Sequence, residues 1–183
     1  MVNIEMKIKN LTVFCGSKPG NDPLFLKHAE ILGKLLAQHN INLVYGGGNK
    51  GIMGVLANAA LDNGGKVIGI MPTILAIPEH AHPNLTEMYE VKDMHTRKKL
   101  LYEKGDAALI LAGGFGTMDE FFEMLTWNQL NIHNKKIYIL NSNGFYNHLI
   151  ELINKMESEN FLYHKVSDKL IVLNTPDELK FLS

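Results

Sequence analysis

The chain lacks paired cysteines, long apolar runs and a recognisable leader. Its 183 residues include one cysteine, so no disulfide can form within the chain. No run approaches the roughly 20 apolar residues that a membrane-spanning helix needs, and residues 1–10 lack the apolar core of a secretion signal. We therefore expect a cytoplasmic protein with no membrane contact.

Charge of either sign is not in excess either. The 18 basic and 19 acidic residues are interspersed and leave a formal net charge of −1. A dedicated nucleic-acid binder carries a basic surplus, so we expect no nucleic-acid partner and favour a small ligand. The length suits a single domain, residues 1–183, with one substantial core.

Apolar periodicity predicts strands that alternate with helices along the chain. The expected strands are 11–15, 41–45, 66–71, 86–91, 107–112, 136–140 and 170–173. The expected helices are 24–39, 51–65, 94–105, 117–130, 145–158 and 175–182, the last with Thr175 as its cap. This alternation implies an α/β fold, namely a Rossmann-like, doubly wound parallel sheet with helices on both faces. Residues 72–83, which hold three of the six prolines, are expected to form a loop.

Three glycine-rich segments follow predicted strands, at residues 15–20, 45–51 and 112–117. Ligands of parallel α/β sheets bind beyond the carboxyl ends of the strands, so the site is expected there. Glycine lets the backbone approach a ligand closely, and helix N-termini favour phosphate. A tight turn explains any one of these segments equally well. Three at one sheet edge favour a phosphate or nucleotide site.

The second segment has the spacing of a dinucleotide-binding fingerprint in Gly46, Gly48 and Gly51. That fingerprint also requires an acidic residue about 20 positions later to bind the ribose. The third predicted strand ends in G-I-M-P-T, without an acid, and no P-loop sequence is present. The segment therefore argues against a dehydrogenase or a P-loop nucleotidase.

Glu120 has two explanations from the pattern alone. The T-x-x-E spacing from Thr117 to Glu120 is typical of a capping box, in which the carboxylate reaches back to the helix start, and this spacing favours capping. However, Asp119 and Glu120 would repel a phosphate at the same place, so a cation must compensate or the ligand must present another group. Arg97, predicted to share a helical face with Leu101, is a candidate clamp for phosphate or carboxylate. An ordinary surface arginine is the alternative.

Two motifs together establish a resemblance to a known family. Residues 113–120 read G-G-F-G-T-M-D-E, and residues 94–98 read M-H-T-R-K. They resemble the P-G-G-x-G-T-x-x-E and M-H-x-R-K motifs of the Lonely-guy family of phosphoribohydrolases, formerly labelled possible lysine decarboxylases. The similarity continues in V-F-C-G-S, Y-G-G-G-N-K-G-I-M-G and T-W-N-Q-L-N-I-H, and so covers essentially the whole chain. The leading proline of the motif is Ala112 here, which removes a backbone constraint but no functional group.

The resemblance implies hydrolysis of the N-glycosidic bond of nucleoside 5′-monophosphates, such as cytokinin riboside monophosphates or AMP, to free base and ribose 5-phosphate. It implies that Arg97 and Glu120 are the catalytic pair and that the protein is a homodimer with its site near the subunit contact. The implied ligand contacts are Glu79, Lys98, Gly114, Phe115, Gly116, Thr117 and Thr126. We add Ser17 and Gly47, from the first two glycine-rich segments, as candidate nucleotide contacts, although a turn explains Ser17 equally well.

We expect neither a metal nor a cofactor. The histidines show no metal-ligand spacing, and nothing in the sequence indicates a lysine that binds pyridoxal phosphate. Cys15, at a strand end, is expected to be a small buried hydrophobe rather than a nucleophile. The alternative from another class is a non-catalytic carrier of nucleotides or of molybdenum cofactor, which has a related glycine-rich fold; the Arg97–Glu120 pair argues against it.

Overall fold

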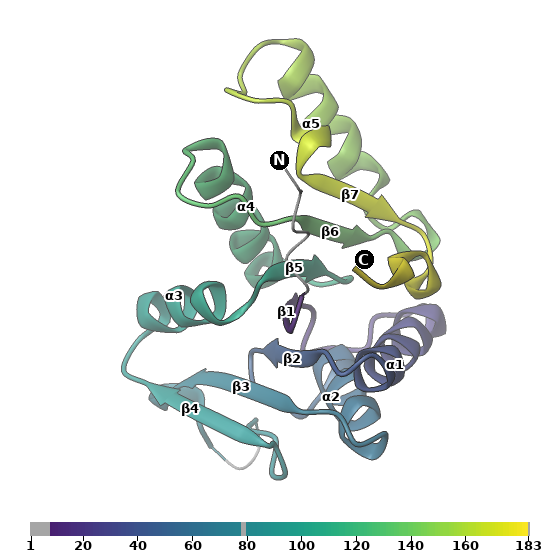
Figure 1. Cartoon of the computed structure of the whole chain (residues 1–183), viewed down its shortest axis with the longest axis vertical. Helices are drawn as coiled ribbons and strands as arrows, with labels where there is room; N and C mark the ends of the chain where they lie inside the picture. The colour runs from purple at the N-terminus through teal and green to yellow at the C-terminus, as the bar shows by residue number, and fades with distance from the viewer. Residues whose placement is uncertain (1–7, 78–79, 183) are drawn as a thin grey trace, which may run out of the picture.

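A parallel sheet organises the computed structural model, which describes residues 8–77 and 80–182 (Figure 1). Its seven strands lie in the order β4-β3-β2-β1-β5-β6-β7, and every strand pairing is parallel. The strands are β1 (Asn10–Phe14), β2 (Asn42–Tyr45), β3 (Val67–Pro72), β4 (Glu87–Val91), β5 (Ala107–Ile110), β6 (Ile137–Leu140) and β7 (Leu170–Leu173). The strand order reverses between β1 and β5, which places a crevice at their carboxyl ends.

Helices cover both faces of the sheet, as predicted. In Figure 1, α1 and α2 lie on one side of the sheet and α3 and α4 on the other. The bounds are α1 (Pro23–Gln38), α2 (Gly51–Asp62), α3 (Met94–Lys104), α4 (Phe115–Gln129) and α5 (Asn147–Ser158). Short 3-10 segments are η1 (Thr73–Leu75), η2 (Ser142–Gly144), η3 (Val166–Asp168) and η4 (Pro176–Leu182). The Rossmann-like doubly wound sheet is thereby confirmed.

Two clusters of buried apolar side chains hold these layers together, one on each face of the sheet. Leu32 of α1 and Leu56 of α2 belong to the first cluster, and Leu101 of α3 and Phe121 of α4 belong to the second. Successive residues of a strand point to opposite faces, so the central strands contribute to both clusters and are mostly apolar. Thr12 in β1 is a buried exception, and its hydroxyl donates to the Leu101 oxygen at 2.8 Å.

Most predicted elements are present with small changes at their ends. The loop expected at 72–83 contains η1, and its residue Ala81 forms an antiparallel bridge with Gly48. The C-terminal helix is a 3-10 segment rather than an α-helix, and it is Glu178 whose carboxylate accepts the N–H of Thr175 at 3.0 Å. Within the described ranges, no helix is long and apolar enough to cross a bilayer. A single domain over 1–183 stays a prediction, since both termini extend outside the described residues.

Candidate active site

Helices α3 and α4 bring Arg97 and Glu120 into a buried ion pair. Arg97 Nη1 donates to Glu120 Oε1 at 2.7 Å, and Arg97 Nε donates to the backbone oxygen of Ile70 in β3 at 3.2 Å. The two side chains are only 11% and 7% exposed. Asp93 fixes the start of α3 by accepting the Thr96 N–H at 2.7 Å, which sets Arg97 in the first turn. The guanidinium is thus held from both sides.

Gly46, at the end of β2, makes room for that guanidinium. A Cβ added at Gly46 would collide with Arg97 Nη2. Gly47 follows with φ of +78°, a backbone conformation that favours glycine. At Gly46, the second glycine-rich segment therefore makes room for the Arg97 side chain. The spacing of its glycines alone does not indicate this role.

Glu120 combines a buried carboxylate with one accessible oxygen. Burial raises the pKa of Glu120 above its ordinary value, and the Arg97 guanidinium works in the opposite direction. Oε1 accepts from Arg97, whereas Oε2 accepts no hydrogen bond from the described residues. Nor is Oε2 among the fully enclosed unbonded side-chain atoms of the described chain, which comprise Asn49 Oδ1 alone. Oε2 therefore reaches the solvent and is available to a ligand.

The capping-box prediction for Glu120 is wrong. The helix begins at Phe115, three residues earlier than a cap at Thr117 predicts, and Gly114 is its N-cap with no side-chain hydrogen bond. Thr117 is therefore already inside the first turn, and Glu120 lies too far along the helix to reach the N-cap. Tertiary pairing with Arg97 takes the carboxylate instead. The predicted loop from Gly114 to Thr117 is accordingly the helix start itself.

Lys98, next to Arg97, is already neutralised by α4. Its Nζ lies 3.2 Å from Asp119 Oδ2 and 3.1 Å from Glu123 Oε1. Burial works to lower the pKa of Lys98, but hydrogen bonds to Glu123 and Asp119 outweigh it and the pKa is raised. Lys98 is therefore close to the Arg97–Glu120 pair, as expected of a site residue, but in this structure its charge is directed at carboxylates.

A cavity of about 280 Å³ lies at the β1–β5 crevice, beside the start of α4. Its walls include residues 16–18, which follow β1, and Gly113 and Gly114, which precede α4. Phe25 and Phe145 form an apolar wall and contact each other edge to face at 5.5 Å between ring centroids. The cavity thus joins Ser17 and Gly114 of the expected site, and Phe115, 94% exposed, projects from the adjoining helix start.

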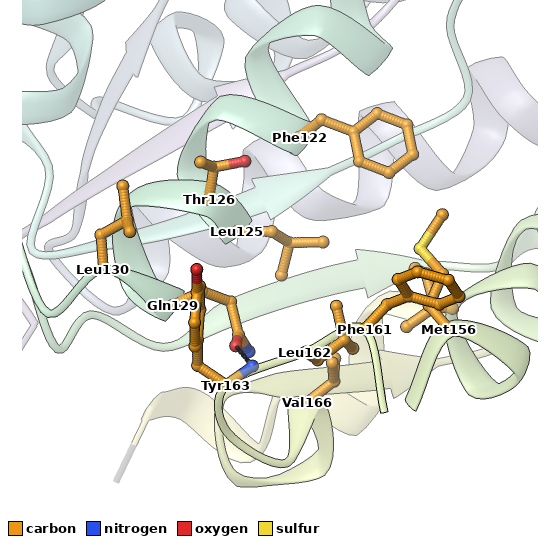
Figure 2. Close-up of a pocket in the computed structure, with 11 residues that line it drawn as sticks. Phe122, Leu125, Thr126, Gln129, Leu130, Met156, Phe161, Leu162, Tyr163 and Val166 are labelled. Atoms are coloured by element: carbon orange, nitrogen blue, oxygen red, sulfur yellow. Dashed lines mark hydrogen bonds between the residues drawn. The ribbon is translucent and has the colours of Figure 1, made fainter. Parts of the chain in front are cut away.

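Thr126 lies apart from these groups. It is six residues beyond Glu120 on α4, about 9 Å along the helix axis. Figure 2 shows it in a second pocket, of about 250 Å³, with Phe122 and Leu125 of α4 and with Phe161 and Tyr163 from beyond α5. The structure therefore does not bring Thr126 to the Arg97–Glu120 pair within the chain. Glu79 lies outside the described residues.

Cys15 is buried, as the sequence predicts. Cys15 is 2% exposed, and burial raises the pKa of its thiol far above the usual range, so the thiol is inert as a nucleophile. In the described part of the chain, no three histidine, cysteine or acidic side chains are grouped so that they could hold a metal ion.

Sequence reasoning did not single out Gly46, Lys18, Asp119 or Glu123 for the positions they occupy. Gly46 and Lys18 lie in glycine-rich segments, but their partners are more than 50 residues away in the chain, at Arg97 and at the start of α4. Only Glu123 had a local indicator, because it lies four residues after Asp119 and therefore on the same side of the helix. The other contacts depend on the packing of three strand ends.

Comparison with known proteins gives a consistent picture. A family model described as "Possible lysine decarboxylase" matches residues 53–180. A Rhodococcoides fascians protein named cytokinin riboside 5′-monophosphate phosphoribohydrolase is 47% identical over 165 residues, 90% of this chain and 83% of that protein. An Arabidopsis thaliana protein of the same name is 42% identical over 161 residues, 88% of this chain and 76% of that protein.

Among solved structures, a molybdenum cofactor binding protein from Rippkaea orientalis superposes with a TM-score of 0.70. It covers 97% of this chain and 96% of its own, at 20% sequence identity. At that identity the likeness concerns the fold alone.

Proposed function

We propose, because this chain belongs to the Lonely-guy family of phosphoribohydrolases, that it hydrolyses the N-glycosidic bond of nucleoside 5′-monophosphates. The products are a free base and ribose 5-phosphate. One observation carries the proposal: a buried carboxylate, Glu120, is held by Arg97 at 2.7 Å while its second oxygen reaches the solvent at the carboxyl edge of the sheet. Relatives sharing 42–47% identity carry the corresponding enzyme name.

The reaction needs a fixed negative charge near the sugar. As the bond to the base breaks, the ribose gains positive charge in an oxocarbenium-like transition state. Glu120 Oε2 stabilises this charge and orients or deprotonates the attacking water. The raised pKa of Glu120 makes the carboxylate a stronger base than an exposed one, so its environment suits proton abstraction. Arg97 fixes the orientation of the carboxylate and favours its ionised form.

The phosphate is assigned to the start of α4. The N–H groups of residues 115–117 have no partner within the helix, and the helix dipole favours an anion there. In this arrangement the ribose faces Glu120 and the phosphate faces the backbone, which separates the two negative groups. Gly114, Phe115, Gly116 and Thr117 are the proposed contacts, together with Ser17 and Gly47 from the neighbouring strand ends. The resemblance adds Lys98 and Glu79 to the proposed ligand contacts.

A lysine decarboxylase activity fits these residues poorly. Schiff-base chemistry with pyridoxal phosphate needs a lysine whose amine becomes neutral. Lys98 is the lysine beside the Arg97–Glu120 pair, and two carboxylates raise its pKa and hold it charged. The residues present therefore do not suit that cofactor.

A homodimer in the cytoplasm completes the proposal. The resemblance implies that the site lies near the subunit contact, and Thr126 lines the second pocket, about 9 Å along α4 from Glu120. Light scattering on the purified protein decides the oligomeric state; a monomeric mass with full activity would contradict the dimer. The formal charge of −1 supports a small ligand over nucleic acid.

The test of function is base release measured by chromatography. Pure protein is incubated with AMP, other nucleoside monophosphates and isopentenyladenosine monophosphate, with the corresponding nucleosides as controls. We expect free base and equimolar ribose 5-phosphate from monophosphates. Tight nucleotide binding by calorimetry with no base released from any of them would contradict hydrolysis and support a carrier.

A further inference from the structure

Lys18 lines the β1–β5 cavity together with Gly113 and Gly114, which precede α4. We propose that Lys18 binds the 5′-phosphate of the substrate in this cavity, together with the Thr117 hydroxyl and the N-terminal N–H groups of α4. This inference rests on the proposed function, and it assigns Lys18 and the β1–β5 cavity to the 5′-phosphate of the substrate. Four observations support it.

The backbone that carries Lys18 is fixed against the two other strand ends. The Gly16 N–H donates to the Ala112 oxygen at 3.0 Å, and the Met53 N–H of α2 donates to the Gly16 oxygen at 3.2 Å. Gly51 has φ of +58°, and its Cα lies so close to the Ser17–Lys18 backbone that an added Cβ would clash with it. The segment after β1 is therefore held in place before any ligand arrives.

The hydroxyl of Thr117 lies beside Gly113, which lines the cavity, and has no hydrogen-bond partner in the described chain. Thr117 is 4% exposed, and its hydroxyl makes no hydrogen bond with any described residue. It is also not fully enclosed, because Asn49 Oδ1 is the one enclosed and unbonded side-chain atom of the described residues. A Cβ at Gly113, which lines the cavity, would collide with this hydroxyl. Buried polar groups normally have a hydrogen-bond partner, and a phosphate oxygen can accept the hydrogen bond of this hydroxyl.

Lys18 is the charged residue that lines the cavity, whereas the cations near Glu120 already have partners. Arg97 is paired with Glu120, and Lys98 with Asp119 and Glu123. These five side chains carry two positive and three negative charges, so they do not attract a dianion. Lys18 is exposed, lines the cavity, and forms no ion pair within the described chain. Its flexible stem allows an ammonium to meet the phosphate oxygens.

The cavity also suits a phosphate in shape. Glycine at residues 16, 113 and 114 leaves no side chain between the backbone and a phosphate in the cavity, so the phosphate can approach closely. Phe25 and Phe145 add apolar surface to the wall, and apolar surroundings strengthen a charge–charge interaction relative to open water. The site thus combines a cation, a hydroxyl and a helix start around one volume.

The experiment compares Lys18→Gln with Lys165→Gln, which removes the same charge at an exposed position preceding η3. We expect Lys18→Gln to raise KM for AMP about tenfold, the size of one charge-assisted hydrogen bond, while kcat stays within about twofold because the phosphate is bound equally in ground and transition states. The inhibition constant of ribose 5-phosphate rises by the same factor, and that of free adenine does not. Lys18→Arg restores most of the loss, and Lys165→Gln behaves as wild type.

Equal KM values for Lys18→Gln and Lys165→Gln, with circular dichroism showing both folded, would overturn the assignment while leaving hydrolysis intact. If the wild-type protein releases no base, calorimetry with ribose 5-phosphate on wild type and Lys18→Gln still decides the matter. Tenfold weaker binding by the variant supports Lys18 as a phosphate ligand, and unchanged binding contradicts it.

Discussion

Helices α3 and α4 are joined by two sets of ion pairs that have opposite characters. Arg97 and Glu120 form a single short pair with side chains 11% and 7% exposed. One residue further along α3, Lys98, itself 15% exposed, meets Asp119 and Glu123, whose side chains are 60% and 26% exposed. The two cations are similarly buried, but Glu120 is enclosed, whereas the carboxylate partners of Lys98 reach the solvent.

The difference lies in what solvent does to each pair. Water screens the Lys98 contacts, so they contribute little to stability and can be exchanged for another partner. The Arg97–Glu120 pair carries a desolvation cost that its mutual attraction and the bond to Ile70 offset. A buried charge pair of this kind is a poor stabiliser. In the proposed function this pair serves the reaction, whereas the Lys98 contacts lie beside it and can exchange partners.

The largest expected effect comes from Glu120→Gln. Base release from AMP should fall about 1,000-fold or more, because the amide cannot take a proton or stabilise positive charge on the ribose. The protein still folds, since the amide oxygen accepts the Arg97 N–H. The matched control is Asp119→Asn, the neighbouring carboxylate, which should change the rate only a few-fold. A Glu120→Gln variant with the activity of the control would remove Glu120 from the chemistry.

Removal of Arg97 should lower the free energy of unfolding by an amount that depends on pH. Arg97→Met leaves the Glu120 carboxylate buried without a partner, which lowers the free energy of unfolding by about 3 kcal/mol near pH 8. The pKa of Glu120 is already raised above 4.5 by burial, and loss of Arg97 raises it further. A raised carboxyl pKa means that stability is kept below pH 4.5 and lost as pH rises through the folded-state pKa.

Urea unfolding at pH 5 and pH 8 measures this difference for Arg97→Met. The double variant Arg97→Met, Glu120→Gln should recover most of the stability at pH 8, since no unpaired charge remains. Equal destabilisation at both pH values would show that lost packing, rather than the buried carboxylate, is responsible.

Gly46→Ala tests whether the space left by Gly46 positions the Arg97 guanidinium. The new Cβ would collide with Arg97 Nη2 and displace it from Glu120. We expect turnover to fall about 100-fold, as a misplacement of roughly 1 Å can do. Gly64→Ala is the control, because a Cβ there meets nothing within 4 Å, although its φ of +77° carries a small strain of its own. Turnover of Gly46→Ala equal to that of Gly64→Ala would mean that Arg97 position is not limiting.

The smallest effect is expected for Glu123→Gln. Lys98 keeps Asp119 as a partner, and a partly exposed pair contributes about 0.5 kcal/mol, so the midpoint of urea unfolding should barely move. Turnover should change less than about threefold. If Glu123→Gln instead matched Arg97→Met in either measurement, the contrast between the two sets of ion pairs would be wrong.

The helix-capping prediction shows where local pattern stops being informative. T-x-x-E at residues 117–120 is typical of a capping box, yet α4 begins at Phe115 and the carboxylate turns to Arg97, 23 residues away. A capping box competes for the carboxylate with every cation that the fold brings near. The spacing of residues within one helix does not show which cation the fold brings near. Here that cation is Arg97, which belongs to the second motif, M-H-T-R-K.

The N-terminal cap of α1 gives the opposite case. Asp22 and Pro23 predict a helix start, and the structure has the helix begin at Pro23 with Asp22 accepting the Leu24 N–H at 2.8 Å. No distant cation competes in any described contact of that carboxylate; its other oxygen accepts from the Asn143 amide at 2.7 Å. Local rules hold where the tertiary structure adds no stronger partner.

The order of strands and helices, the apolar character of the sheet and the resemblance carried by two motifs are properties of the sequence by itself, because periodicity and turn chemistry are local. The tertiary structure decided what the charged residues do. It paired Arg97 with Glu120, neutralised Lys98, and set Lys18 against the start of α4. Parallel strands place residues far apart in the chain at one edge, and only there do burial and distance fix the charge, partners and accessibility of each group.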